Sequence, residues 1–334
     1  MDAARWIYPS PRGLYVEPAG LFIDPPGAVD RAVITHGHSD HARPGHAHAL
    51  ATPATLAIMR ARLGGGFAGT TQALAYGEAI RIGGVDLRLV PAGHILGSAQ
   101  VVLEHAGQRV VVSGDYKRVA DPTCAPFEPV GCDIFVTEAT FGLPVFRHPD
   151  PLGEVRRLLD SAALFAERCH VVGVYALGKC QRLIALLRQA GYDRPVYLHG
   201  ALQALTDLYV GEGIALGDVR PVADAPRGDL MGAIVLAPPS ALADRWSRRL
   251  PDPLSALASG WMRVKQRAKQ RGVELPLVIS DHADWHELTR TFADVGAAEI
   301  WVTHGREEAL VHHAATHGLR ARALALVGYE DEGS

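Results

Sequence analysis

This sequence contains few cysteines and no long apolar run. The four cysteines, Cys124, Cys132, Cys169 and Cys180, form no CxxC pair, so we expect neither a disulfide framework nor a thiolate metal site. No apolar run approaches the roughly 18 residues that a membrane-spanning helix needs. The first ten residues, MDAARWIYPS, also lack the apolar stretch of a signal peptide. We therefore expect a cytoplasmic protein that does not contact membranes.

An excess of charge of either sign is missing as well. The 334 residues carry 33 Lys and Arg against 36 Asp and Glu, a net charge of −3, and 48% of them are hydrophobic. This composition is typical of a globular protein with one large domain or two smaller ones, in which any binding of nucleic acid has to be local. Histidine, by contrast, is abundant, with 16 residues. Because imidazole is the commonest metal ligand and carries protons near neutral pH, the histidines are the first candidates for chemistry.

The apolar residues follow two kinds of pattern along the chain. Short β-branched runs recur, and several are separated by stretches with helical spacing, some of which end in glycine. These patterns predict an α/β fold. The strand-like runs are VDLRLV, QRVVVS, CDIFVT, HVVGVY, RPVYL, GAIVLA, LPLVIS and AEIWVT, and the helical ones are PATLAIMRARLG, EVRRLLDSAALFAER, CQRLIALLRQAG and REEALVHHAATHG.

Several reactive residues directly follow strand-like runs. In α/β folds the loops beyond the carboxyl ends of strands converge on one edge, so residues distant in sequence can meet there. A single residue of this kind is more simply explained as a turn residue that caps a helix or satisfies backbone groups. Five occurrences favour a shared functional site. They are His36, Asp115, Glu138, His282 and His304.

The segment THGHSDH at residues 35–41 contains three imidazoles and a carboxylate within seven residues. In extended backbone alternate side chains point the same way, so His36 and His38 can bind one ion. Asp40 and His41, after the chain turns, can face a second. These ligand types suit zinc, manganese or iron. Further candidate ligands are His94, Asp115 and His304.

This order of ligands resembles the metallo-β-lactamase superfamily, in which an HxHxDH motif precedes a distant His, a bridging Asp and a final His. The resemblance implies an αββα sandwich that binds two divalent transition-metal ions, with zinc as the first expectation and manganese and iron as alternatives. It also implies that a hydroxide bridging the two ions is the nucleophile. Asp24, in LFIDPP, matches the acid that supports the ligand loop without binding the metal. The first ion would take His36, His38, His94 and Asp115, and the second would take Asp40, His41, Asp115 and His304.

A long insertion separates two of these ligands, since Asp115 and His304 lie about 190 residues apart by their numbers. This feature resembles the β-CASP branch of the superfamily, nucleases in which a second α/β domain interrupts the lactamase-like fold. The resemblance implies a lactamase-like domain formed by residues 1–143 and 276–334, with a β-CASP domain inserted at 144–275.

Two further motifs match this branch. Glu138 in TEATFG and His282 in ISDHAD lie where the branch has an acid and the histidine paired with it. A carboxylate that accepts a hydrogen bond from imidazole fixes its orientation and favours its protonated form. The resemblance therefore implies that His282 protonates the departing sugar oxygen and that Glu138 orients it, with Asp40 as the third catalytic residue. Taken alone, Glu138 would be interpreted as a solvated loop acid.

Two segments of the insertion are suited to a polyanion. In VGVYALGKCQRL, a glycine and a lysine fall between a strand and a helix, where backbone N–H groups and an ammonium can bind phosphate. In ASGWMRVKQRAKQR, a tryptophan lies among basic residues and can stack on a base. A solvated helix face explains the second run almost equally well. The residues expected to contact nucleic acid are Gly178, Lys179, Trp261, Arg263, Lys265 and Arg267.

Longer strings, among them WIYPSPRGLYV, GDYKRVADPTCAPFEPV and SDHADWHEL, resemble bacterial DNA exonucleases associated with ATP-dependent DNA ligases, a group within the β-CASP branch. The resemblance spans essentially the whole chain. It implies a DNA exonuclease of DNA repair, functionally associated with a ligase and a helicase. Because His304 is typical of RNA-processing members, an RNA-processing nuclease remains an alternative. A small-molecule metallo-hydrolase and an inactive scaffold are disfavoured by the insertion and by the complete ligand set.

Overall fold

The computed structural model describes residues 3–324 and 326, and the chain divides into two compact units. The first unit is formed by the two ends of the chain, Met1–Phe146 and His282–Ser334, and the second by Arg147–Asp281. Helices and strands occur in both units, which confirms the predicted α/β class. None of the described helices combines the length and the hydrophobicity needed to cross a bilayer.

The first sheet of the first unit contains six strands that neighbour one another in chain order. β1, β2 and β3 are antiparallel, whereas β3, β4, β5 and β6 are parallel. Because β4 ends at Val33, the segment 35–41 emerges from its carboxyl end. The strands are β1 (Ile7–Ser10), β2 (Gly13–Val16), β3 (Leu21–Ile23), β4 (Arg31–Val33), β5 (His46–Ala51) and β6 (Ala68–Ala73).

The second sheet has seven strands in the order β19-β18-β11-β10-β9-β8-β7. β7 to β10 form an antiparallel meander, and β10, β11, β18 and β19 are parallel neighbours. The carboxyl ends of β10, β11 and β18 therefore lie at one edge of the sheet. The strands are β7 (Ala79–Ile82), β8 (Val85–Pro91), β9 (Ala99–His105), β10 (Gln108–Val112), β11 (Ile134–Ala139), β18 (Glu299–Gly305) and β19 (Arg320–Ala323).

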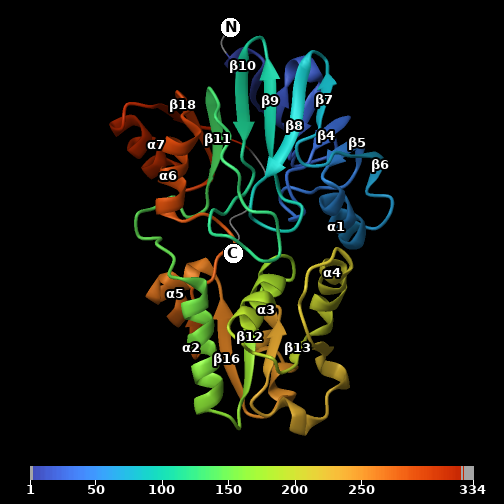
Figure 1. Cartoon of the computed structure of the whole chain (residues 1–334), viewed down its shortest axis with the longest axis vertical. Helices are drawn as coiled ribbons and strands as arrows, with labels where there is room; N and C mark the ends of the chain where they lie inside the picture. The colour runs from blue at the N-terminus through green and yellow to red at the C-terminus, as the bar shows by residue number, and fades with distance from the viewer. Residues whose placement is uncertain (1–2, 325, 327–334) are drawn as a thin grey trace. The chain divides into compact units, whose positions relative to one another are not determined.

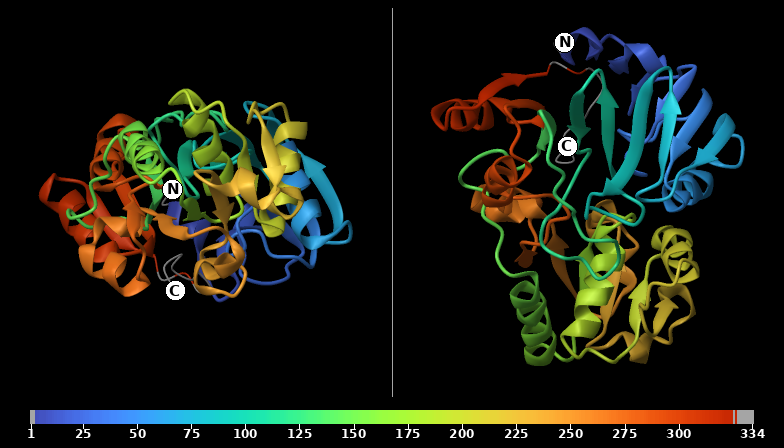
Figure 2. Two further views of the ribbon diagram at one scale, coloured as in Figure 1. Left: turned by 90° about the horizontal axis from the view of Figure 1, so that it is seen from below. Right: turned by 45° about the horizontal axis from the view of Figure 1, so that its top comes forward.

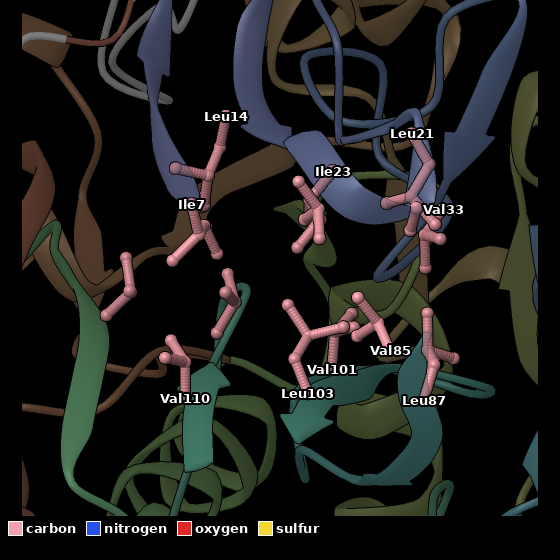
Figure 3. Close-up of a cluster of buried hydrophobic side chains, with 14 of the residues drawn as sticks. Ile7, Leu14, Leu21, Ile23, Val33, Val85, Leu87, Val101, Leu103 and Val110 are labelled. Carbon is pink, nitrogen blue, oxygen red and sulfur yellow. The ribbon is translucent and has the colours of Figure 1, made fainter. Parts of the chain in front are cut away.

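The two sheets pack face to face around an apolar core (Figure 3). Because strand side chains alternate between faces, alternate residues of a strand can enter this core, as Val85, Leu87 and Leu89 do in β8. Burying one such side chain contributes roughly 1.5–3 kcal/mol. The labelled residues are Ile7, Leu14, Leu21, Ile23 and Val33 from the first sheet and Val85, Leu87, Val101, Leu103 and Val110 from the second.

Helices cover the outer face of each sheet. α1 (Pro53–Leu63) starts at Thr52, whose side chain accepts a hydrogen bond from the Thr55 amide, and it buries Leu56 and Met59 against the first sheet. α6 (Trp285–Val295) and α7 (Glu307–Thr316) pack against the second sheet beside β11 and β18 (Figure 1; Figure 2). The first unit therefore has four layers, helix, sheet, sheet and helix.

The second unit is built on a single parallel sheet with the strand order β14-β13-β15-β12-β16-β17. Its central strands β12 and β15 are buried along their whole length and are apolar except for His170, as expected of parallel strands covered on both faces. The strands are β12 (Cys169–Gly173), β13 (Val196–Leu198), β14 (Val219–Pro221), β15 (Ile234–Ala237), β16 (Pro253–Ala258) and β17 (Leu275–Leu277), and the helices are α2 (Pro151–Leu164), α3 (Lys179–Gln189), α4 (Gly200–Gly211) and α5 (Lys265–Arg271).

Candidate metal centre

The first unit gathers imidazole and carboxylate groups from four separate segments into one buried cluster. Four ligand atoms, one each from His36, His38, His94 and Asp115, all lie within 4.8 Å of one another. His36 Nε2 is 3.3 Å and His94 Nε2 is 3.8 Å from Asp115 Oδ2, while His94 Nε2 is 3.0 Å from His38 Nδ1. Two atoms bound to one tetrahedral zinc ion lie about 3.3 Å apart. The donors therefore fit a single transition-metal ion.

A second group of donors shares Asp115. Ligand atoms of His41, Asp115 and His304 lie within 4.8 Å of one another, and His41 Nε2 is 3.4 Å from Asp115 Oδ2. Asp40 Oδ2 lies 3.6 Å from the same His41 nitrogen. The chain thus brings together the seven ligands expected from the sequence, with one carboxylate common to both groups.

Asp24 holds the ligand loop, residues 35–41, by three contacts. Its Oδ1 accepts a hydrogen bond from the Thr35 amide at 2.7 Å, and its Oδ2 accepts one from Thr35 Oγ1 at 2.5 Å. The same Oδ2 lies 2.7 Å from His41 Nδ1. A proton on His41 Nδ1 directs the electron pair of Nε2 towards Asp115 and Asp40. Asp24 therefore contacts the ligand loop, and its supporting role stays a prediction.

Burial keeps two of the histidines neutral. It lowers the pKa of His304 to about 3, with a further contribution from the nearby His41. Burial also lowers the pKa of His36 well below its ordinary value, and His41 adds to the effect. Because only neutral imidazole can donate an electron pair to a metal, both side chains are in the correct form at neutral pH.

The carboxylates create a field that favours positive charge. Burial alone would lower the pKa of His41, but Asp115, Asp24 and Asp40 together raise it well above its ordinary value. Burial alone would raise the pKa of Asp115, but neighbouring histidines, His41 first, hold it well below its ordinary value. The site therefore concentrates negative charge where a cation is expected to bind.

Glu138 and His282 form a pair beside Asp115. Glu138 Oε2 lies 2.9 Å from His282 Nδ1, and Glu138 Oε1 accepts a hydrogen bond from the Tyr116 amide at 2.8 Å. His282 Nδ1 is 4.0 Å from Asp115 Oδ2, and its ring centroid lies 4.6 Å from that of His94. Burial raises the pKa of Glu138, and His282 offsets part of that rise. The pair that the sequence predicted is thus in contact.

Two positions in the site use unusual backbone. Asp24 and His304 are among the few described non-glycine residues with positive φ, at 43° and 57°. The pairing of β11 with β18 changes register between Thr137 and Ala139, which flank Glu138. Such irregularities cluster at functional sites because they redirect side chains. The sequence suggested that Glu138 and His304 follow their strands. In the structure both lie within the last two residues of a strand, at these irregular positions.

The glycine and lysine expected to bind phosphate are engaged by other groups. The Gly178 amide donates to Gln181 Oε1 at 2.9 Å. Lys179 is buried at the start of α3, and its Nζ lies 2.7 Å from Asp281 Oδ2. In this arrangement the ammonium neutralises a buried carboxylate, and the expected phosphate contact stays a prediction.

The basic segment is more accessible. Arg263 and Lys265 are exposed, and the Arg267 guanidinium lies 4.0 Å from the centre of the half-buried Trp261 ring. Within residues 3–324, no ion pair to an acidic side chain involves Arg263, Lys265 or Arg267. These side chains are therefore available to an anionic ligand.

Three residues at the site were not identified from the sequence. Arg62 of α1 donates a hydrogen bond to the Gly37 carbonyl within the ligand loop. Lys117 and Glu287 form a buried pair next to His282. For Glu287 a signal existed, because Asp284 and Glu287 have the spacing of a capping box at the start of a helix. The other two roles depend on contacts between distant segments.

Several known proteins resemble all or part of this chain. No protein-family model matches the chain. A probable DNA ligase of Opitutus terrae is 30% identical over 305 residues, which is 88% of this chain and 28% of the ligase. An uncharacterised protein in the lig 3′ region of Acidianus ambivalens is 30% identical over 150 residues, 42% of this chain and 99% of that protein. Endoribonuclease YSH1 of Saccharomyces cerevisiae is 31% identical over 117 residues, 34% of this chain and 15% of the enzyme.

A solved structure resembles the fold. The crystal structure of a protein of unknown function from Enterococcus faecalis V583 has a TM-score of 0.54 and 14% identity, and the match covers 90% of this chain and 80% of that one. The chain belongs to the family of the Acidianus ambivalens protein, and its homology to YSH1 supports a place in the β-CASP branch of the metallo-β-lactamase superfamily. It spans only a minor part of the probable ligase and of the endoribonuclease.

Proposed function

We propose that this protein is a metal-dependent nuclease, more specifically an exonuclease that degrades DNA during repair. The observation that carries the proposal is the position of Asp115 Oδ2, which lies between 3.3 and 3.8 Å from nitrogens of His36, His41 and His94. One carboxylate oxygen thus faces both groups of metal donors and lies 4.0 Å from His282 Nδ1. The names of the relatives, an endoribonuclease and a probable DNA ligase, support nucleic acid as the substrate.

The metal centre would hold two divalent ions. The ligands are those expected from the sequence, with Asp115 shared, and zinc is the proposed metal because the donors are mainly imidazoles. Ions bound there would supply Lewis acidity, which lowers the pKa of water and stabilises charge that develops on a phosphate.

The residues around the ions perform the proton transfer. His282 Nδ1 donates its hydrogen to Glu138 Oε2, which leaves Nε2 to deliver a proton to the departing sugar oxygen. Glu138 in turn is fixed by the Tyr116 amide, so the imidazole has one orientation. The buried carboxylate also stabilises the imidazolium form before transfer.

We further propose that the first unit is a metallo-β-lactamase sandwich and that the second is an inserted β-CASP domain. The four layers of the first unit support this assignment, as do the two segments of chain that form it. In the second unit, Trp261 and the basic residues of α5 would contact the nucleic-acid backbone and bases. The relatives named after a ligase and a lig region support a functional association with a DNA ligase.

The experiment uses DNA and RNA strands of one sequence, labelled at the 5′ or the 3′ end, with a panel of divalent ions. We expect stepwise shortening of DNA from one end, slower cleavage of RNA and no cleavage with a chelator. His94→Ala and Asp40→Ala should reduce cleavage to the level of the chelated protein without loss of folding by circular dichroism. His48→Ala, which alters an exposed histidine of β5, is the matched control.

The homology to YSH1 favours a second candidate, an RNA-processing nuclease with the same centre. Preferential cleavage of the RNA strand would support it over the DNA exonuclease. Wild-type rates in His94→Ala and Asp40→Ala would refute the metal centre in either case, and rapid turnover of a lactam or a thioester with no cleavage of either strand would indicate a small-molecule hydrolase.

A further inference from the structure

A buried lysine–glutamate pair joins the two loops that carry Asp115 and His282. Lys117 Nζ lies 3.3 Å from Glu287 Oε2 and donates a hydrogen bond to the His282 carbonyl at 3.3 Å. The lysine side chain is 4% exposed and the glutamate side chain 12%. We call this pair the Lys117–Glu287 clamp.

Glu287 has more partners than a helix cap requires. In its capping box, Oε2 accepts the Asp284 amide at 3.0 Å, and Asp284 Oδ1 accepts the Glu287 amide at 2.9 Å. Its Oε1 accepts two further amides, from Arg118 at 3.0 Å and Val119 at 2.7 Å. One carboxylate therefore binds both the start of α6 and the loop that follows Asp115.

The clamp lies next to the proton-transfer pair. The Ala283 amide donates to the Tyr116 carbonyl at 2.6 Å, and the Tyr116 amide donates to Glu138 Oε1 at 2.8 Å. His282 is therefore held through its own carbonyl, through the residue after it and through Glu138. Displacement of either loop would move the imidazole relative to Asp115.

The energetic cost of the pair indicates a role beyond stability. Removing an ammonium and a carboxylate from water is costly, and apolar side chains of similar volume often serve stability as well. A geometric constraint is a reason to keep such a pair. General acid catalysis needs the donor within hydrogen-bond reach of the leaving oxygen, so a small displacement is costly.

We propose that Lys117 and Glu287 are positioning residues that hold His282 where it protonates the leaving oxygen. This inference rests on the proposed nuclease function. Neither residue touches the substrate in this role. Loss of the clamp should slow the reactions that need leaving-group protonation and spare those that do not.

The test compares two phosphodiester substrates, an end-labelled DNA oligonucleotide and bis(p-nitrophenyl) phosphate. The p-nitrophenolate group leaves without a proton, whereas a sugar alkoxide needs one. For Glu287→Gln and Lys117→Met we expect kcat on the oligonucleotide to fall about 100-fold, as for loss of a general acid. The rate on the activated ester should stay near that of the wild-type protein, with unchanged metal content by elemental analysis.

Asp294→Asn is the matched control. Arg118 Nη2 lies 2.5 Å from Asp294 Oδ2, so this ion pair also links the loop after Asp115 to α6, but it is more exposed. Its loss should leave both rates unchanged. In ¹⁵N-histidine spectra of the metal-free protein, the His282 Nδ1–H signal, assigned by its absence in His282→Ala, should broaden in Glu287→Gln and persist in Asp294→Asn.

Equal losses on both substrates would overturn the inference, because they would indicate general damage to the site. Unchanged rates on both substrates in Glu287→Gln would overturn it too. If the wild-type protein cleaves neither substrate in the presence of divalent ions, the proposed function fails and the clamp has no reaction to serve.

Discussion

At the scale of single residues, Asp24 contacts both the ligand loop and one of the candidate metal ligands. Its two oxygens contact the Thr35 amide, Thr35 Oγ1 and His41 Nδ1, all between 2.5 and 2.7 Å. These contacts fix the ligand loop and the His41 imidazole relative to each other. The negative charge of Asp24 separately helps to raise the pKa of His41.

We predict that Asp24→Asn weakens metal binding about 10- to 100-fold, since an amide cannot replace a carboxylate that accepts three contacts. The measurement is a zinc titration against a competing chelator. Asp30→Asn, at an exposed aspartate nearby, should bind zinc like the wild-type protein. Equal zinc affinity in Asp24→Asn and wild type would contradict the supporting role.

The residues that could be predicted from the sequence are those whose spacing is itself the signal. His36, His38 and His41 lie close together in the chain, so their proximity in space follows from local geometry. Lys117 and Glu287 lie 170 positions apart, and nothing near either one indicates the other. Their pairing depends on how β10 and α6 are placed by the core of the first unit.

At the scale of elements, the strand-like runs correspond to observed strands. VDLRLV coincides with β8, QRVVVS with β10 and AEIWVT with β18. These strands are apolar enough to be recognised without their neighbours. Of the first sheet, the sequence predicted the run that leads into His36, which corresponds to β4. The other strands of this sheet were not predicted, and β6 is exposed along most of its length.

Helix α6 was also missed, although its sequence contained the evidence. Apolar residues at 285, 288, 292 and 295 have helical spacing, and the capping box precedes them. The capping box of α6 includes Glu287, which pairs with Lys117 beside His282.

Helix α5 provides the element-scale prediction. Lys265, Lys269 and Arg271 of α5 are exposed, as is Arg263 just before the helix, so we expect these side chains to bind phosphates of a single strand and to release counterions. The slope of log binding constant against log salt concentration is negative for single-stranded DNA. Replacing Arg263, Lys265 and Lys269 with alanine should reduce its magnitude by about 2. Fluorescence anisotropy in the metal-free protein measures binding without cleavage.

A control variant replaces three exposed arginines elsewhere in the second unit, Arg156, Arg245 and Arg248. It removes the same charge but should keep the wild-type slope. If both variants reduce the slope equally, the effect reflects net charge, and α5 is an ordinary solvated helix.

At the scale of the whole molecule, two units with separate cores should respond differently to metal removal. Among the described residues, every group of three or more clustered donors lies in the first unit. A ligand that binds only the folded state stabilises it by about 4 kcal/mol at a thousandfold excess over its dissociation constant. That stabilisation acts on the unit that contains the site.

We predict that a chelator raises hydrogen exchange in β10, β11 and β18 and leaves β12 and β15 unchanged, as measured by mass spectrometry of the intact chain. The strands of the first group lead into the ligands, so they open more often when the ions no longer hold their ends together. Restoring zinc to the chelated protein should reverse the change, and His94→Ala should resemble the chelated wild-type protein in the absence of any chelator. Equal loss of protection in both groups of strands would mean that the ions stabilise the chain as a single cooperative unit.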